Sequence, residues 1–186
     1  MKNPWKRLRS KVIYKNPWIT VREDKVIRPD GKKGIYGVVY LDNGVAVVAM
    51  TSKKEIYLVG EWRYAIGKFS WSLPAGYSEK NEKSLKSAKR ELEEEVGLKA
   101  KNWKYLGTNY ENVGVLNQKI KFYLATDLTK VNQKLDGTEK GMKVMKVPIK
   151  QAIKLIMEDK IFDGSAIIGI FKAVEYLKGK NKKAKI

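Results

Sequence analysis

The sequence predicts a mixed α/β or α+β sandwich, in which a β-sheet packs against helices. Three observations predict it. Short apolar runs bounded by turn residues fill the first part of the chain, a single helical stripe follows, and further strands precede two helical segments at the end. With 186 residues, the chain has the length of one domain with an attached arm.

The expected strands are separated by turn signals. Val21–Arg28 and Ile35–Leu41 have the composition of strands, the second broken by Gly37. Between them, Pro29-Asp30-Gly31 predicts a turn, because Pro presets φ and Gly accepts a positive φ. A second turn, Asp42-Asn43-Gly44, leads into an apolar run. The further strands that we expect are Val45–Met50, Ile56–Val59, Trp103–Leu106, Ile120–Ala125 and Val144–Val147.

Helical periodicity begins near the middle of the chain. Apolar residues at three- and four-residue spacing form one stripe across Asn81–Val96, and Gly97 stands where a C-cap is expected. Two further helices are expected at Ile149–Glu158 and Ser165–Leu177, with Asp163 as the cap of the second. The stripe consists of Leu85, Ala88, Leu92 and Val96.

These elements divide the chain into three parts. Residues 1–20 form an N-terminal arm, residues 21–178 form the domain, and residues 179–186 form a frayed basic tail. No apolar run is long enough to cross a bilayer, and the N-terminus lacks the apolar stretch of a secretory signal. We therefore expect a cytoplasmic protein that does not associate with a membrane.

The composition excludes several kinds of chemistry. The chain has no cysteine and no histidine, which removes disulfides, thiolate catalysis and the usual general base. Its formal net charge of +19 attracts polyanions. That charge fits a solvated surface, the steering of an anionic substrate, or the binding of nucleic acid. Nucleic acid is not favoured, because the basic runs carry no recognisable binding motif.

Four carboxylates lie close together on the central helix, in the segment Arg90–Gly97. Helical geometry places Glu91, Glu94 and Glu95 on one face, within an arc of about 100°. Like charges stacked in this way repel, so a compensating cation is implied, and Mg²⁺ prefers carboxylate oxygens. Metal ions there would neutralise a diphosphate and position a water for attack on phosphorus. The alternative is a solvated helix face balanced by Lys86, Lys89 and Arg90.

A longer pattern surrounds this helix, consisting of Gly76, Glu82, Arg90-Glu91-Leu92, Glu94-Glu95 and Gly97-Leu98. It resembles the Nudix box, which reads Gly, five residues, Glu, seven residues, Arg-Glu-apolar, one residue, Glu-Glu, one residue, Gly-apolar. The chain departs from that pattern nowhere. Because the pattern fixes many positions at set spacings, the resemblance is a strong signal.

The resemblance extends outside the box and favours one branch of the family. Glu61-Trp62-Arg63-Tyr64 and Ser72-Leu73-Pro74-Ala75-Gly76 look like the stretch before the box in ADP-ribose and nucleoside diphosphate sugar hydrolases, although Glu61 stands where Gln is usual. The layout of the last two helices is also similar, so the resemblance covers residues 20–178. Members that prefer ADP-ribose carry a proline downstream of the box. The corresponding stretch, Asn112–Val115, has none, which favours a broader nucleoside diphosphate sugar hydrolase.

The resemblance implies a fold and a metal site. The fold would be an α/β/α sandwich, with a mixed β-sheet between helices and a leading N-terminal β segment. The cofactor would be Mg²⁺, with Mn²⁺ as the alternative. Arg90 would orient the carboxylates for catalysis by Glu94 and Glu95, and Glu82 would shape the loop. The implied metal ligands are Glu91, Glu94, Glu95 and the backbone carbonyl of Ala75, with Glu79 as a further candidate.

The resemblance also implies a substrate site and a general base. Arg63 resembles the arginine that meets substrate phosphate, and Trp62 and Tyr64 are candidates for stacking on the nucleobase. In this branch a loop glutamate often takes the proton of the attacking water, and Glu139 is the only glutamate of the corresponding loop, Leu135–Gly141. The alternatives are core packing for the aromatic residues, which include Trp71, Trp103 and Tyr110, and Asp136, Glu111 or the metal ions themselves in place of Glu139.

The implied reaction is hydrolysis of the diphosphate linkage of a nucleoside diphosphate sugar, such as ADP-ribose, to a nucleoside monophosphate and a sugar phosphate. Members of this branch commonly form homodimers through N-terminal strands, and Trp5 and Trp18 in the arm fit that arrangement. One alternative is hydrolysis of another diphosphate, such as NADH, a dinucleotide or capped RNA. The other is a non-catalytic Nudix module that binds nucleic acid.

Overall fold

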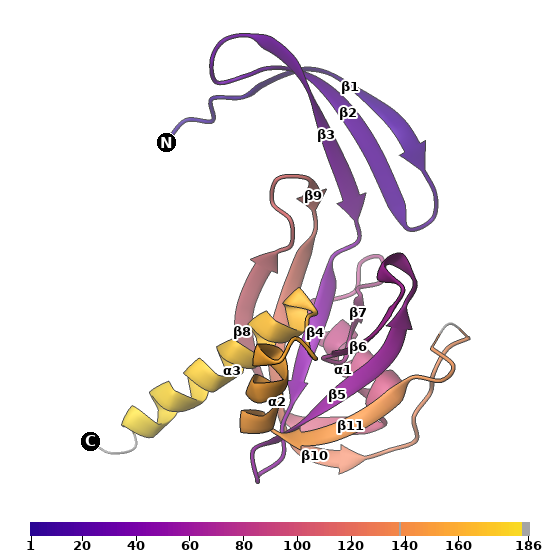
Figure 1. Ribbon diagram of the computed structural model, residues 1–186, viewed down its shortest axis with the longest axis vertical. Coiled ribbons are helices and arrows are strands. Elements are labelled where there is room, and N and C mark those ends of the chain that lie inside the picture. The colour runs from indigo at the N-terminus through magenta and orange to yellow at the C-terminus, as the bar shows by residue number, and fades with distance from the viewer. Residues whose placement is uncertain (138, 184–186) are drawn as a thin grey trace. The chain divides into compact units, whose positions relative to one another are not determined.

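The computed structural model describes residues 1–137 and 139–183, which fall into two compact units (Figure 1). The first unit consists of residues 1–43 and 110–119, and the second consists of residues 44–109 and 120–186. Within the described ranges, no helix is long and apolar enough to cross a membrane. The expected division into an arm, a domain and a tail stays a prediction, although a single strand passes through the first of its boundaries and a single helix through the second.

The first unit is one four-stranded sheet of β1 (Lys6–Lys15), β2 (Ile19–Ile27), β3 (Lys33–Leu41) and β9 (Leu116–Asn117), in that order. The first three strands are antiparallel, and β9 pairs parallel to β3. The turn expected before β3 is present, because Gly31 has a φ of 78° and its N–H donates to the Arg28 carbonyl at 2.9 Å. The break predicted at Gly37 was wrong, since β3 runs through this residue opposite Glu23.

The second unit combines strands and helices. Its elements are β4 (Gly44–Ala49), β5 (Glu55–Arg63), the 3₁₀ helix η1 (Tyr64–Ile66), β6 (Lys68–Ser72), β7 (Ala75–Tyr77), α1 (Ser84–Val96), β8 (Leu98–Tyr110), β10 (Lys119–Lys130), β11 (Lys143–Pro148), α2 (Ile149–Met157) and α3 (Gly164–Lys183). One sheet has the order β7-β4-β10-β8 and is mixed, because β4 is parallel to β10 and antiparallel to β7. The other has the order β11-β5-β6 and is antiparallel.

Both faces of β4 are buried, which places this strand at the centre of the second unit. Val45 and Val47 alternate with Ala46 and Val48, as the period of a strand requires. The first pair packs with Leu92 of α1, and the second pair packs with apolar residues of α2 and α3. The sheet therefore lies between α1 on one face and α2 and α3 on the other, which confirms the predicted α/β/α sandwich (Figure 1).

Two predicted helix caps are present. Gly97 ends α1 in the left-handed conformation, with a φ of 66°, and its N–H donates to the Glu93 carbonyl at 3.0 Å. At the start of α3, a carboxylate oxygen of Asp163 accepts a hydrogen bond from the N–H of Ala166 at 2.7 Å.

Several element bounds differ from the prediction. α1 begins at Ser84 rather than Asn81, because Asn81 has a positive φ of 67° that no helix accommodates. β8 extends over Leu98–Tyr110, well beyond the four residues expected to be a strand. A frayed tail was expected from residue 179, but α3 continues to Lys183, and residues 184–186 lie outside the described part.

Candidate active site

The acidic face of α1 is turned into the protein. Glu91 and Glu95 keep only 5% and 4% of their surface exposed, although both are acids. Glutamates are almost never buried to this extent unless they are paired or coordinate a cation. Because both side chains are buried, they do not form a solvated helix face. Their carboxylates need either a nearby positive charge or protonation.

A third carboxylate, that of Glu139, joins them from a distant loop. Oxygen atoms of Glu91, Glu95 and Glu139 all lie within 4.8 Å of one another, a grouping that could hold a metal ion. We call these three carboxylates the acidic cluster. The sequence predicted Glu91 and Glu95 on one helix face and Glu139 separately on a loop, and the structure brings all three together.

The loop that carries Glu139 is docked on the end of α1. The last carbonyls of a helix have no partner within the helix and must be satisfied from outside. Here the N–H of Lys134 donates to the Glu94 carbonyl at 3.0 Å. The side-chain amide of Gln133 donates to the Glu95 carbonyl. The two residues just before the loop thus cap α1, and this anchors the segment that leads to Glu139.

Arg90 binds the polar groups beside the cluster. Its Nη1 lies 2.7 Å from a carboxylate oxygen of Glu91 and donates to Glu94 at 2.9 Å. Its Nη2 donates to Glu82 at 3.2 Å and to the carbonyl of Tyr77 at 2.9 Å. A planar guanidinium can donate hydrogen bonds to several oxygens at once. The contact with Tyr77 was not foreseen, and the orienting role of Arg90 stays a prediction.

β7 supplies the backbone that lies against the cluster. The N–H of Ala75 donates to the carboxylate of Glu95 at 2.9 Å. The adjacent Gly76 makes room for Glu91, because a Cβ here would overlap that carboxylate. The glycine is thus required by close approach, since its φ is not in the left-handed region. Metal binding by the carbonyl of Ala75 stays a prediction.

Burial changes the protonation of the acidic cluster. It raises the pKa of Glu95 to about 9, and the charges of Glu91, Glu139 and Glu61 add to this effect. Burial also raises the pKa of Glu91 to about 7, which the adjacent Arg90 opposes. A divalent cation would remove the cost of ionising both groups. Since all the donors are carboxylate oxygens, the cluster fits a hard ion such as Mg²⁺.

Glu94, a predicted ligand on α1, lies outside the acidic cluster. Together with Glu79 and Glu82 it lines an open cavity of about 280 Å³. One carboxylate oxygen of Glu82 is buried and has no hydrogen-bond partner among the described residues, and the Lys86 ammonium lies 3.9 Å away. A buried oxygen without a donor is costly. Roles for Glu94 and Glu79 in metal binding stay predictions.

The three predicted substrate residues lie at the junction of β5 and η1. Nη1 of Arg63 lies 2.6 Å from Oε1 of Glu61, and Nη2 donates to the hydroxyl of Ser72 at 3.1 Å. Trp62 is 66% exposed and Tyr64 is 98% exposed, so neither ring belongs to the core. Ser72 belongs to the stretch before the box, but its contact with Arg63 was not predicted, and only the pairing of β5 with β6 could have revealed it.

Two of the other candidate aromatic residues pack against neighbours. The rings of Trp71 and Phe69 meet edge to face with centroids 5.3 Å apart, and Trp103 contacts Tyr123 in the same way at 6.3 Å. Core packing, the alternative interpretation, therefore describes Trp71 and Trp103. Tyr110 is 47% exposed, and the ammonium group of Lys119 lies 5.5 Å from the centre of its ring.

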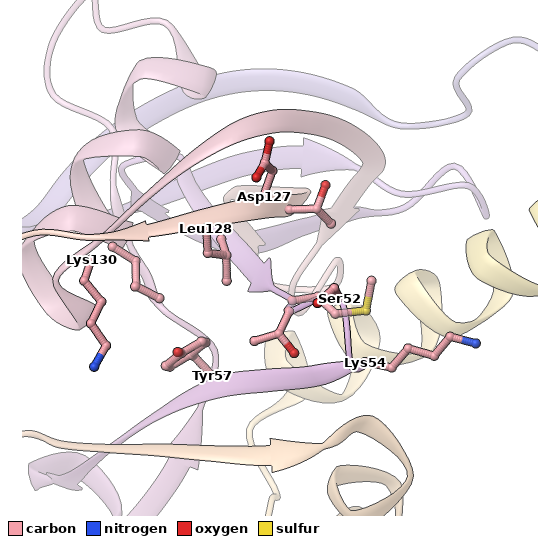
Figure 2. A pocket seen from close by; sticks show the side chains of 10 residues that line it. Ser52, Lys54, Tyr57, Asp127, Leu128 and Lys130 are labelled. Carbon is pink, nitrogen blue, oxygen red and sulfur yellow. The ribbon is translucent and has the colours of Figure 1, made fainter.

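A separate cavity of about 580 Å³ lies at the carboxyl ends of β4 and β10 (Figure 2). β7, which carries Ala75, pairs with the other end of β4. Figure 2 shows the side chains of Lys54 and Lys130 pointing away from each other, so these two cations do not converge on one anion. The acidic cluster is therefore the better candidate for the active site.

Residues 41–163, more than half of the chain, match the model of the family described as NUDIX domain. The chain belongs to the Nudix family. The match contains the whole box, including both box members of the acidic cluster, Glu91 and Glu95. Residues 5–39 of this Nudix protein match a second model, described as nucleoside diphosphate sugar hydrolase N-terminal domain.

Known relatives include two proteins named ADP-ribose pyrophosphatase. The one from Mycobacterium tuberculosis is 31% identical over 163 residues, which cover 87% of this chain and 79% of the relative. The one from Bacillus subtilis is 28% identical over 173 residues, which cover 92% and 91%. A crystal structure of an ADP compounds hydrolase has a TM-score of 0.83, covers 95% of both chains and is 19% identical. This last likeness supports the Nudix fold.

Proposed function

We propose that this chain hydrolyses the diphosphate linkage of nucleoside diphosphate sugars, ADP-ribose among them, to a nucleoside monophosphate and a sugar phosphate. The convergence of Glu91, Glu95 and Glu139 within 4.8 Å carries the proposal, because three carboxylates around one point suit a divalent cation and, through it, a diphosphate. The N-terminal match supports the sugar branch, and the names of the two relatives support ADP-ribose as a substrate. The chain is accordingly a Nudix hydrolase.

The cation of this proposal is Mg²⁺, with Mn²⁺ as the alternative. Glu91 and Glu95 would hold it, since both side chains are buried and their oxygens converge with one of Glu139. Glu94 and the carbonyl of Ala75 remain proposed as further ligands. A cation bound there would neutralise the charge of the diphosphate and stabilise the charge that develops during attack on phosphorus.

The side chains of the protein bind the substrate and move the proton. Arg63 offers a guanidinium to a substrate phosphate, and the exposed rings of Trp62 and Tyr64 offer surfaces to the base or the sugar. Glu139 takes the proton of the attacking water, because the chain has no histidine and this carboxylate lies in the acidic cluster. Arg90 keeps the carboxylates of α1 in place.

The proposal includes a homodimer. β1 supports it, because all ten of its residues are exposed and it lies at the edge of its sheet. Exposed edge strands and apolar patches are surfaces that other chains cover. Light scattering would test this, and a monomer mass at micromolar concentration would contradict it. The large apolar side chains of β1 are Leu8, Val12, Ile13 and Tyr14.

A substrate panel with analysis of the phosphate products tests the proposal. It would contain ADP-ribose, other nucleotide sugars, NADH, a dinucleotide and capped RNA, each with Mg²⁺ and with EDTA. We expect a nucleotide sugar to be cleaved fastest, and cleavage to stop in EDTA. A preference for capped RNA would favour the alternative that the net charge of +19 supports. Binding without cleavage of any compound would indicate a non-catalytic module.

The cytoplasmic location also stays a prediction, which cell fractionation would test.

A further inference from the structure

The hairpin of β5 and β6 has two different faces. Side chains alternate along a strand, so Glu61 and Arg63 lie on one face of β5 and Trp62 lies on the other. The register places Ser70 of β6 opposite Glu61, on the same face. Ser70 and Ser72 are both buried, whereas Trp62 is mostly exposed. The polar face of the hairpin is therefore turned into the protein.

Two contacts fix Arg63 on this polar face. Its Nη1 lies 2.6 Å from Oε1 of Glu61 on the same strand. Its Nη2 donates to the hydroxyl of Ser72 on the neighbouring strand at 3.1 Å. A planar guanidinium that is held at two nitrogens has a defined direction, which a lysine ammonium would lack. Since both charged side chains are partly exposed, the pair contributes more to direction than to stability.

The polar face is connected to the acidic cluster through the backbone. Ser72 precedes Ala75 by three residues, which is about 10 Å along an extended chain. The N–H of Ala75 in turn donates to the carboxylate of Glu95 at 2.9 Å. The charge of Glu61 is also among those that act on Glu95. Arg63 is therefore linked through Ser72 and Ala75 to the cluster, which a diphosphate would meet in the proposed function.

We infer that Glu61 is a positioning residue, whose ion pair with Arg63 sets the direction in which this guanidinium meets the substrate phosphate. The inference rests on the proposed function, and it gives a role to a position at which the chain departs from the pattern of its branch. The side-chain oxygen of glutamine could accept a hydrogen bond from Arg63 without the charge, whereas alanine could not. The two substitutions therefore separate positioning from net charge.

Kinetics of Glu61→Ala and Glu61→Gln with ADP-ribose and Mg²⁺ test the inference. We expect Glu61→Ala to raise KM about tenfold while kcat stays within a few-fold, and Glu61→Gln to restore KM. In an Arg63→Ala background, Glu61→Ala should change KM no further. The matched control is Glu55→Ala, which breaks a 3.2 Å ion pair with Lys146 at the opposite end of β5 and should leave KM unchanged.

A second measurement does not depend on catalysis. In protein labelled with ¹⁵N-arginine, the side-chain Nε–H resonance of Arg63 is identified by its loss in Arg63→Lys. We expect this resonance to shift toward that of a freely rotating arginine in Glu61→Ala and to stay in place in Glu61→Gln. An unchanged resonance, or a KM that is unchanged or lower in Glu61→Ala, would overturn the inference. If the wild type cleaves no diphosphate, the proposed function fails, while the resonance still decides whether Glu61 holds Arg63.

Discussion

Gly76 lies so close to Glu91 that a Cβ on this glycine would overlap the carboxylate. Gly76 belongs to β7 and Glu91 to α1, so the close approach defines how the strand and the helix meet. The preceding residue of β7 is Ala75, whose N–H donates to the carboxylate of Glu95. Two adjacent residues of one strand therefore contact two members of the acidic cluster.

We expect Gly76→Ala to lower kcat by at least about a hundredfold, because the added methyl displaces Glu91 and a small misplacement in an active site has effects of this size. The free energy of unfolding should fall by about 1–3 kcal/mol through overpacking. Steady-state kinetics and thermal melting measure the two effects. Gly37→Ala is the control, since a Cβ there meets nothing within 4 Å. Equal activity of Gly76→Ala and the wild type would contradict the proposed role of this contact.

Glu95→Gln tests whether the cluster acts through its charge. The substitution keeps the shape of the side chain, so we expect a folded protein whose kcat is lower by two or more orders of magnitude, about 3 kcal/mol of transition-state stabilisation. The control is Glu93→Gln on the same helix, whose carboxylate is paired with Lys99 at 3.3 Å and with Lys134 at 3.6 Å. If both variants lose activity equally, the effect belongs to the helix and not to the cluster.

Local patterns were enough to predict α1 and the carboxylates that it carries. Its apolar stripe has the helical period, and the buried side chains of Ala88 and Leu92 follow from it. The cap at Gly97 follows from the conformational freedom of glycine. The box supplied Glu91 and Glu95 with their spacing. These features need only neighbouring residues, which is why the sequence carries them.

Contacts between distant segments could not be predicted in the same way. Glu139 reaches the cluster because Gln133 and Lys134 cap α1, and no periodicity encodes such a docking. The contact of Arg63 with Ser72 depends on the register of β5 with β6, which one strand alone does not specify. The bounds of β1 were missed as well, because a strand that is exposed on both faces has no alternation of apolar and polar residues to mark it.

The metal-free protein should lose stability as the pH rises. Burial raises the pKa of Glu95 from 4.5 to about 9 in the folded state, so that state binds the proton more tightly than the unfolded chain does. The stabilisation from this proton is complete below about pH 4.5 and is lost as the pH rises toward about 9. In EDTA, Glu95→Gln should therefore gain in Tm relative to the wild type between about pH 5.5 and 8.5. A difference in Tm between the two proteins that is the same at about pH 5.5 and about pH 8.5 would contradict this. Mg²⁺ should stabilise the wild type more than the variant.

The final prediction concerns the general base. Glu139 lies in the acidic cluster, and the N–H of Asp136 donates to its carboxylate at 3.0 Å, so the loop holds it in place. We expect Glu139→Gln to lower kcat at least about a hundredfold while the Kd for ADP-ribose, measured by calorimetry, changes little. A Mg²⁺ titration separates the two roles that this carboxylate could have. If Glu139 acts mainly as a metal ligand, a higher Mg²⁺ concentration restores the rate, whereas the loss of a base is not restored. The same measurements on Glu111→Gln decide against the rival carboxylate if its kcat stays close to that of the wild type. A kcat of Glu139→Gln within a few-fold of the wild type would show that the proton leaves the water by another route.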